Sequence, residues 1–214
     1  MSVRCDPKTH MLAMMAISRA RTCVLRRAPY FARALLRLRF APAVGLNTFG
    51  ITKRGLVYFD PTLVIGPDAW NVEEVAGVLV HELMHRLSRH AERADSFGVQ
   101  DDEFMTWNQV CDAEINYKLE HQFTLPDEPV YPTTLPLGLK EEWIYDISAY
   151  GYVDGDNKHV PILAEELMSR MRVQSAKAAP PPNIYCNKGK AGKPGQSGKP
   201  GQSGKPGQSG KPGQ

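Results

Sequence analysis

The sequence predicts an α+β fold that is mostly helical, with a small antiparallel or mixed sheet beside one amphipathic helix. Three observations support this prediction. Apolar residues recur at helical spacing over most of the chain, one stretch reads as a short strand pair, and the last part has almost no apolar content. A chain of 214 residues can form one domain with a sizeable core. We expect a folded domain over residues 1–176 and a low-complexity tail over residues 177–214.

The first predicted helical segment runs from about Lys8 to Leu38, with a break at Pro29. Seven arginines between Arg19 and Arg39 alternate with apolar residues, which is typical of the solvated face of an amphipathic helix. The formal net charge is only +3, and no aromatic-plus-basic motif accompanies the arginines. The sequence therefore argues against a nucleic-acid partner.

Other features bear on the class of protein and its location. The four cysteines are scattered and form no CxxC pair, so neither a zinc knuckle nor a disulfide framework is indicated. The apolar run Met11–Ile17 has no cleavage-like motif, and no run approaches the about 18 apolar residues of a membrane span. We expect a cytoplasmic protein without membrane contact.

A strand pair is predicted next. Phe49–Ile51 and the β-prone Leu56–Phe59 flank the turn-like Lys53-Arg54-Gly55, and Asp60-Pro61 ends the second strand. This hairpin supplies the small sheet of the predicted fold.

The clearest helix start in the chain is at Asn71. Asn71 and Glu74 have the spacing of an N-cap residue and its N3 partner. Helical spacing then relates the apolar residues Val72, Val75, Val78, Leu79, Leu83 and Leu87. We expect this helix to continue to about Arg93, with Gly98 in the following loop.

Three more helices are expected downstream. They span Thr106–Leu119, Glu141–Tyr150 and Ile162–Val173, the last with Pro161 in its first turn. The segment between Pro126 and Leu139 contains four prolines and is expected to be an extended loop.

Low-complexity sequence makes up the end of the chain. After a run of three prolines, glycine occupies every third position from Gly189 to Gly213. This is formally the collagen period, but the triplets are few and no nucleating domain is evident. The composition favours a flexible, disordered linker over a trimeric collagen-like stalk.

The segment His81-Glu-Leu-Met-His85 has the spacing of a metal site on a helix. Two histidines four residues apart point the same way and can share one ion. Glu82 is turned by about 100° from His81, where it can act as a general base without binding the ion. The spacing thus predicts a zinc-type hydrolytic site.

His90 is the nearest further histidine. It lies nine residues after His81, which on a continuous helix is half a turn from the ligand face. The residues at positions 88 and 91, a serine and an alanine, do not match the glycine and histidine of the metzincin pattern. On a helix that continues to Arg93, His90 is turned away from the metal.

The third ligand is therefore expected from another segment, and the helix around Cys111 is the best source. Asp112 and Glu114 flank its apolar stripe on opposite sides, each about 80° from the centre. Periodicity alone does not choose between these two acids.

Several motifs together resemble a known family, and their order extends over most of residues 15 to 150. They are Arg26-Arg-Ala-Pro-Tyr-Phe31, Tyr58-Phe-Asp-Pro61, His81-Glu-Leu-Met-His85 with His90, Trp107-Asn-Gln-Val-Cys-Asp112, Ile115-Asn116, Leu135-Pro-Leu-Gly-Leu139 and Glu142-Trp-Ile-Tyr145. The chain is similar to bacterial and phage metallopeptidase domains that are often joined to a C-terminal von Willebrand A-like domain. The resemblance implies a zincin-like fold.

The resemblance also implies a site. It selects Asp112 over Glu114 as the third ligand of one Zn²⁺ ion, with His81 and His85, and Glu82 as the base in hydrolysis of a peptide or protein. His90, Tyr145 and Asn116 are candidates for oxyanion binding or for support behind the ligands. A tethered von Willebrand A-like domain or an AAA+ ATPase is the implied partner. The alternative is a metal-stabilised binding module that works through such a partner and cleaves nothing.

Overall fold

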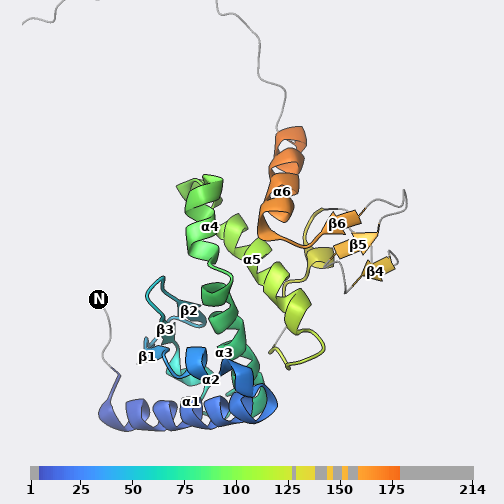
Figure 1. The fold of residues 1–214 in the computed structure, drawn as a ribbon. Helices are drawn as coiled ribbons and strands as arrows, with labels where there is room; N and C mark the ends of the chain where they lie inside the picture. The colour runs from blue at the N-terminus through green and yellow to red at the C-terminus, as the bar shows by residue number, and fades with distance from the viewer. Residues whose placement is uncertain (1–4, 127–128, 138–143, 147–150, 154–158, 179–214) are drawn as a thin grey trace, which may run out of the picture. The chain divides into compact units, whose positions relative to one another are not determined.

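The structure, a computed structural model, describes residues 5–126, 129–137, 144–146, 151–153 and 159–178. All of these lie in one compact unit, Met1–Ala179. In chain order its elements are α1 (Pro7–Arg27), η1 (Pro29–Phe31), α2 (Ala32–Leu35), β1 (Arg39–Pro42), β2 (Phe49–Ile51), β3 (Leu56–Phe59), η2 (Pro61–Leu63), α3 (Val72–Leu87), α4 (His90–Phe97), η3 (Asp101–Glu103), α5 (Phe104–Leu119), η4 (Pro132–Thr134), β4 (Ile144–Asp146), β5 (Gly151–Val153), β6 (His159–Pro161) and α6 (Ala164–Ala178) (Figure 1). Nearly all of the predicted tail lies outside the described residues.

The predicted α+β fold is confirmed, and its first sheet is mixed. The strand order is β1-β3-β2, with β1 parallel and β2 antiparallel to the central strand β3. The predicted hairpin is thus present, closed by a turn in which Gly55 has a φ of 74°. Strand β1 was not predicted, because Arg39–Pro42 has no clear alternation and ends in a proline. That proline is tolerated because β1 is an edge strand.

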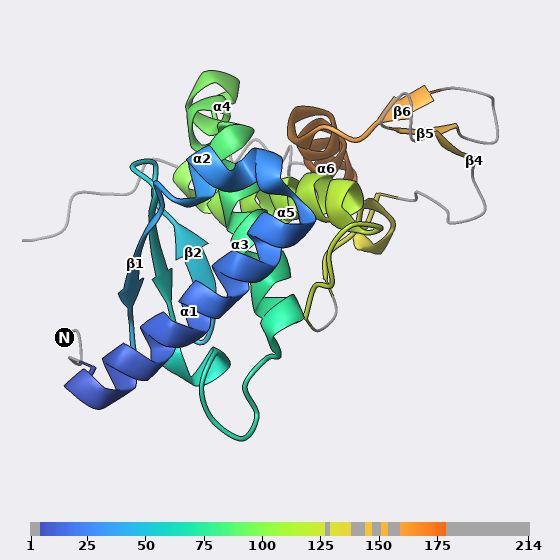
Figure 2. The same ribbon diagram turned by 60° about the horizontal axis from the view of Figure 1, so that its bottom comes forward.

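Helices α1 and α3 form the core beneath this sheet. The buried residues of α1 follow helical spacing and are Ala13, Ile17, Ala20 and Val24. They belong to the same apolar cluster as Leu79 and Leu83 of α3 and Phe59 of β3. Figure 2 shows α1 lying across α3, with the three strands beside both helices. The predicted break at Pro29 is confirmed, because α1 ends at Arg27 and Pro29 begins η1.

Helix α3 packs closely against the backbone of a distant segment at Gly77. A Cβ atom added there would stand 1.9 Å from the carbonyl oxygen of Thr124. Alanine normally stabilises a helix by about 1 kcal/mol relative to glycine. We expect Gly77→Ala to lower the free energy of unfolding instead, by about 1–3 kcal/mol, because the site is already filled.

Chemical denaturation of the variant measures this change. Gly50→Ala is the matched control, because a Cβ there would meet no atom within 4 Å. Equal losses of stability in the two variants would show that the contact at Gly77 is unimportant.

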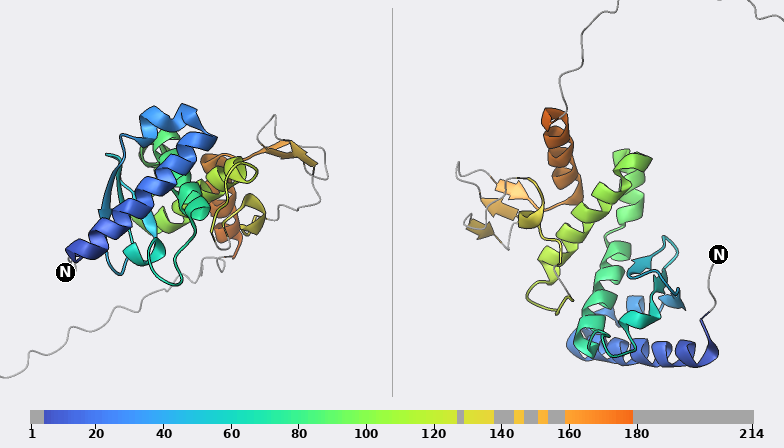
Figure 3. Two further views of the ribbon diagram at one scale, coloured as in Figure 1. Left: turned by 90° about the horizontal axis from the view of Figure 1, so that it is seen from below. Right: turned by 180° about the vertical axis from the view of Figure 1, so that it is seen from behind.

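A second sheet corrects the predicted helix at residues 141–150. Residues 144–146 form β4, and the order β4-β5-β6 is antiparallel throughout. Ile144 and Tyr145 favour strands, and pairing with β5 outweighs the helical pattern of the neighbouring residues. The last helix, α6, begins at Ala164, since Pro161 belongs to β6 rather than to a first helical turn. Figures 1 and 3 show this sheet and the first one on opposite sides of α5.

Among the described residues, no helix is long and apolar enough to cross a membrane.

Candidate metal centre

Helix α3 carries the His-Glu-x-x-His segment and begins as predicted. The Asn71 side chain accepts hydrogen bonds from the amides of Glu73 and Glu74, at 2.9 and 3.0 Å. The Glu74 carboxylate in turn accepts from the amide of Asn71 at 2.7 Å. This capping box fixes the start of the helix and therefore the direction of His81 and His85, about three and four turns later.

The helix does not continue to Arg93, and this corrects the predicted position of His90. α3 ends at Leu87, Arg89 adopts a left-handed backbone with a φ of 55°, and α4 begins at His90. No glycine or proline marks the break. A left-handed non-glycine residue costs roughly 1–2 kcal/mol, so tertiary contacts must hold it.

Two side chains provide such contacts at the break. Arg93 Nη1 donates to the carbonyl oxygen of Ser88 at 3.4 Å, and Trp107 Nε1 donates to the carbonyl oxygen of His90 at 3.3 Å. The Ser88 carbonyl stands at the C-terminal end of α3, where helical carbonyl groups have no partner within the helix. The change of direction brings the His90 ring back against His85, where the ring centroids are 5.1 Å apart.

Three side chains converge in the way that a single metal ion requires. Nε2 of His81 and Nε2 of His85 are 3.0 Å apart, and Asp112 Oδ1 lies 3.4 Å from the first and 3.0 Å from the second. Ligand bonds of about 2.0–2.2 Å in a tetrahedral site place ligand atoms a little over 3 Å apart. Asp112 Oδ1 is also buried without a hydrogen-bond partner. In the described part of the chain these residues form the one group that could hold an ion.

Asn116 orients the first of these histidines. Its side-chain Nδ2 donates to the carbonyl oxygen of Val130 at 2.9 Å, which identifies Oδ1 as its acceptor atom. Oδ1 lies 2.7 Å from His81 Nδ1, so Nδ1 carries the hydrogen. The lone pair of Nε2 then faces His85 and Asp112, and this is the tautomer that binds a metal.

The charges of the site suit a cation. Burial alone would raise the pKa of Asp112, but His81 and His85 outweigh it and hold that pKa well below its usual range. Burial lowers the pKa of His85, which favours the neutral ring that a metal needs. For His81, Asp112 and Glu82 outweigh burial and raise the pKa.

Glu82 lies beside the three converging side chains and is only 6% exposed. Burial raises the pKa of Glu82 to about 7, against the opposing effect of His81. The backbone amide of Ile51 in β2 hydrogen-bonds to the carboxylate and lowers the pKa somewhat. A carboxyl group whose pKa lies near 7 is suited to accept and release a proton at physiological pH.

These groups open into a cleft of about 970 Å³. Phe49–Ile51 of β2 line one side of it, and His81, Glu82, His85 and Asp112 line another. Residues of α4 and α5 and of the loops on either side of β2 also line it. The candidate metal site is therefore accessible to a ligand of peptide size.

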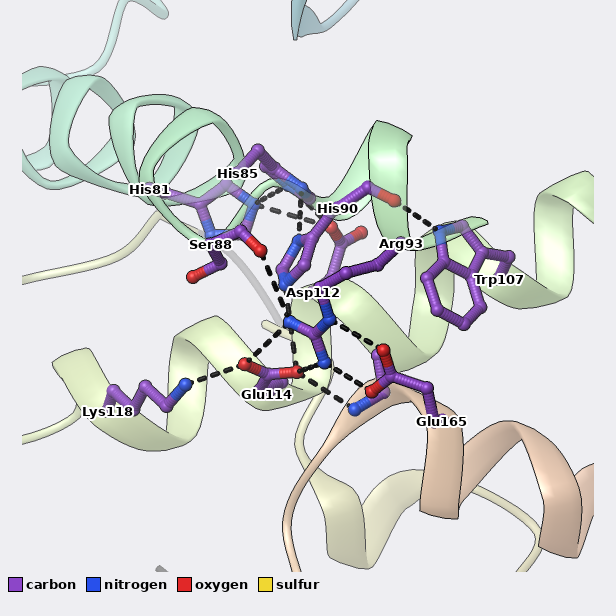
Figure 4. Close-up of polar contacts among 11 residues, drawn as sticks. His81, His85, Ser88, His90, Arg93, Trp107, Asp112, Glu114, Lys118 and Glu165 are labelled. Carbon is purple, nitrogen blue, oxygen red and sulfur yellow. Dashed lines mark hydrogen bonds and ion pairs between the residues drawn. The ribbon is translucent and has the colours of Figure 1, made fainter. Parts of the chain in front are cut away.

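The remaining predicted site residues lie elsewhere. Glu114, the alternative third ligand, is buried against Arg93, Lys118 and the amide of Ala164 (Figure 4). It is absent from the group that could hold an ion. Tyr145 belongs to β4, and its side chain lies outside the described residues. Arg93 was not foreseen at all, since its role depends on acids from α5 and α6 that no local pattern connects to it.

Fold and site together describe an α+β protein in which three side chains that could hold a metal ion lie at an open cleft. The chain belongs to the family described as "Putative metallopeptidase domain", whose model matches residues 14–213. The predicted resemblance is thereby confirmed at the level of the family. No curated protein and no solved structure matches the chain.

Proposed function

We propose that the protein is a zinc-dependent peptidase. His81, His85 and Asp112 would hold one Zn²⁺ ion, and Glu82 would act as the general base. The observation that supports this best is the convergence of three ligand atoms within 4.8 Å at a cleft that also contains the Glu82 carboxylate.

Each residue has a defined part in this proposal. A bound zinc ion supplies Lewis-acid polarisation of a carbonyl group and lowers the pKa of water to about 7. Glu82 takes the proton of the attacking water and returns it to the leaving amine. Asn116 holds His81 in the required tautomer, while the walls of the cleft position the substrate.

The cleft indicates how a peptide would bind. A peptide cannot pair along Leu56–Phe59, because β3 is the central strand and both of its edges are occupied. The edge strand that lines the cleft is β2. An extended peptide can add to such an edge through main-chain hydrogen bonds, and its carbonyl groups then lie near Glu82.

A non-catalytic binding module is the competing function. Such a module needs the three ligands for stability but neither an open cleft nor a buried carboxylate beside them. Burying Glu82 in its charged form costs free energy, and a module that only binds has no need of a carboxylate at this position. The cleft and Glu82 therefore favour hydrolysis. A von Willebrand A-like domain or an AAA+ ATPase remains the proposed partner, on the strength of the family resemblance.

Metal content tests the proposal. We expect the purified full chain to bind one zinc ion per molecule, measured by atomic emission spectroscopy after dialysis. Cleavage of a mixed peptide library should stop when a chelator removes the ion and resume when zinc is returned. The proposed function would be contradicted if the purified protein held much less than one zinc ion per molecule and showed no cleavage that a chelator stops.

A further inference from the structure

Behind His85, on the side away from Asp112, a second histidine and a buried acid form a chain of contacts. His85 Nδ1 lies 3.0 Å from His90 Nδ1, and His90 Nε2 lies 3.6 Å from Glu114 Oε2. His90 and Glu114 are 4% and 1% exposed, so neither exchanges these contacts for water. His90 Nε2 is buried with no hydrogen-bond partner of ordinary length. Figure 4 shows His85, His90 and Glu114 in this order, one behind the next.

The position of hydrogen atoms along this chain decides whether His85 can bind a metal. One of the two facing Nδ1 atoms must carry a hydrogen, because they are 3.0 Å apart. If His90 Nδ1 carries it, His85 Nδ1 is the acceptor, and a neutral His85 then has its one N–H hydrogen on Nε2 and offers no lone pair to an ion. If His85 Nδ1 carries it, Nε2 is free, and the hydrogen of His90 is on Nε2, facing Glu114.

Groups other than His85 and His90 hold the Glu114 carboxylate in place and keep it charged. Arg93 Nη2 donates to its Oε2 at 2.9 Å, Lys118 Nζ donates to its Oε1 at 2.6 Å, and the amide of Ala164 donates to its Oε2 at 2.8 Å. Arg93 is fixed in turn by the carboxylate of Glu165. A negative charge fixed at this place favours the hydrogen of His90 on Nε2.

We propose that Glu114, acting through His90, sets the metal-binding tautomer of His85. Both are positioning residues, since neither is in the group that could hold the ion. The ligands would then be supported on two sides, His81 by Asn116 and His85 by His90 and Glu114. This inference rests on the proposed function and extends it to α4, α5 and α6, whose contacts at Arg93 and Ala164 hold the Glu114 carboxylate.

Tautomers and zinc affinity test the inference in the full chain. Long-range proton–nitrogen NMR of the metal-free protein should show that Glu114→Gln raises the fraction of His85 that has its hydrogen on Nε2, the atom that faces Asp112. Competition with a chelator should show zinc affinity reduced by about 10- to 100-fold in Glu114→Gln, the range found for partners behind metal ligands. Glu166→Gln is the control, because the Glu166 carboxylate pairs with Arg170 at 2.8 Å and takes no part in the contacts from His85 to Glu114, and it should retain the wild-type affinity.

A pair of variants at His90 separates positioning from packing. His90→Asn keeps an acceptor near the position of Nδ1, whereas His90→Phe keeps the ring volume and loses the acceptor. We expect His90→Asn to retain most of the zinc affinity and His90→Phe to lose it by about 10- to 100-fold. The reverse order would show that His90 acts by packing alone and would overturn the inference.

The outcomes distinguish this inference from the proposed function. If the wild-type protein binds no zinc, the proposed function fails. If it binds zinc while Glu114→Gln and His90→Phe bind it equally well with the same His85 tautomer, only the inference fails.

Discussion

Glu82→Gln is expected to abolish most peptide hydrolysis while zinc remains bound. Glutamine has the shape of glutamate and can still accept the hydrogen bond of the Ile51 amide, so the local structure should persist. It cannot accept a proton from water, and general-base catalysis contributes about 10²–10⁴-fold to a rate. We expect kcat/KM to fall by this factor, measured on the best substrate of a peptide library.

Glu92→Gln is the matched control for this change. Glu92 lines the same cleft but forms an ion pair with Arg86 at 3.0 Å and lies outside the group that could hold an ion. It should keep the wild-type rate within about twofold, as expected for a partly exposed ion pair of small energy. Hydrolysis that survives in Glu82→Gln with zinc bound would show that Glu82 is not the base.

The pH profile of the wild type gives an independent check on the same group. The pKa of Glu82 is raised to about 7 by burial, and a bound cation moves it down from there. The charged form is the active base, so kcat/KM should fall as the pH drops through this pKa. The acidic limb should be missing from the residual activity of Glu82→Gln.

The sequence predicts best those parts of the fold that local interactions determine. The Asn71–Glu74 capping box and the strand–turn–strand between Phe49 and Phe59 depend on neighbours in the chain, and both are present. Strand β1 and the second sheet depend on pairing with distant segments, which local patterns do not show. For residues 144–146 the local pattern indicated a helix, and pairing with β5 prevailed.

The same distinction explains what could be predicted of the site. His81, Glu82 and His85 follow from spacing on one helix, whereas the choice of Asp112 required the family resemblance. The prediction that the helix continues to Arg93 and turns His90 away from His85 was wrong, because the break at Arg89 has no glycine or proline. Instead, it is held by Arg93 and Trp107, which donate to carbonyl groups on either side of Arg89. A helix end made by distant donors leaves no signal in the adjacent sequence.

Asp112→Asn should remove most of the zinc affinity, and this is the largest expected effect on binding. Asparagine keeps the size of the side chain. It can also keep the hydrogen bond that Asn108 Nδ2 donates to Asp112 Oδ2 at 3.1 Å. It loses the negative charge of the third ligand, so the affinity should fall by more than the about 100-fold limit for residues behind the ligands. Competition with a chelator measures the loss, and Asp102→Asn, an exposed acid just before α5, is the control.

Glu114 cannot serve as a neutral control, because the structure gives it a place behind His90. Both Asp112→Asn and Glu114→Gln are therefore expected to weaken zinc binding, and affinity alone would not identify the ligand. Cobalt substitution separates them, since the visible spectrum of cobalt reports the atoms bound to it. Asp112→Asn should change the spectrum, whereas Glu114→Gln should keep the wild-type bands at a higher cobalt concentration. The opposite pattern would make Glu114 the ligand and would require α5 to turn about its axis, which its buried contacts with α6 oppose.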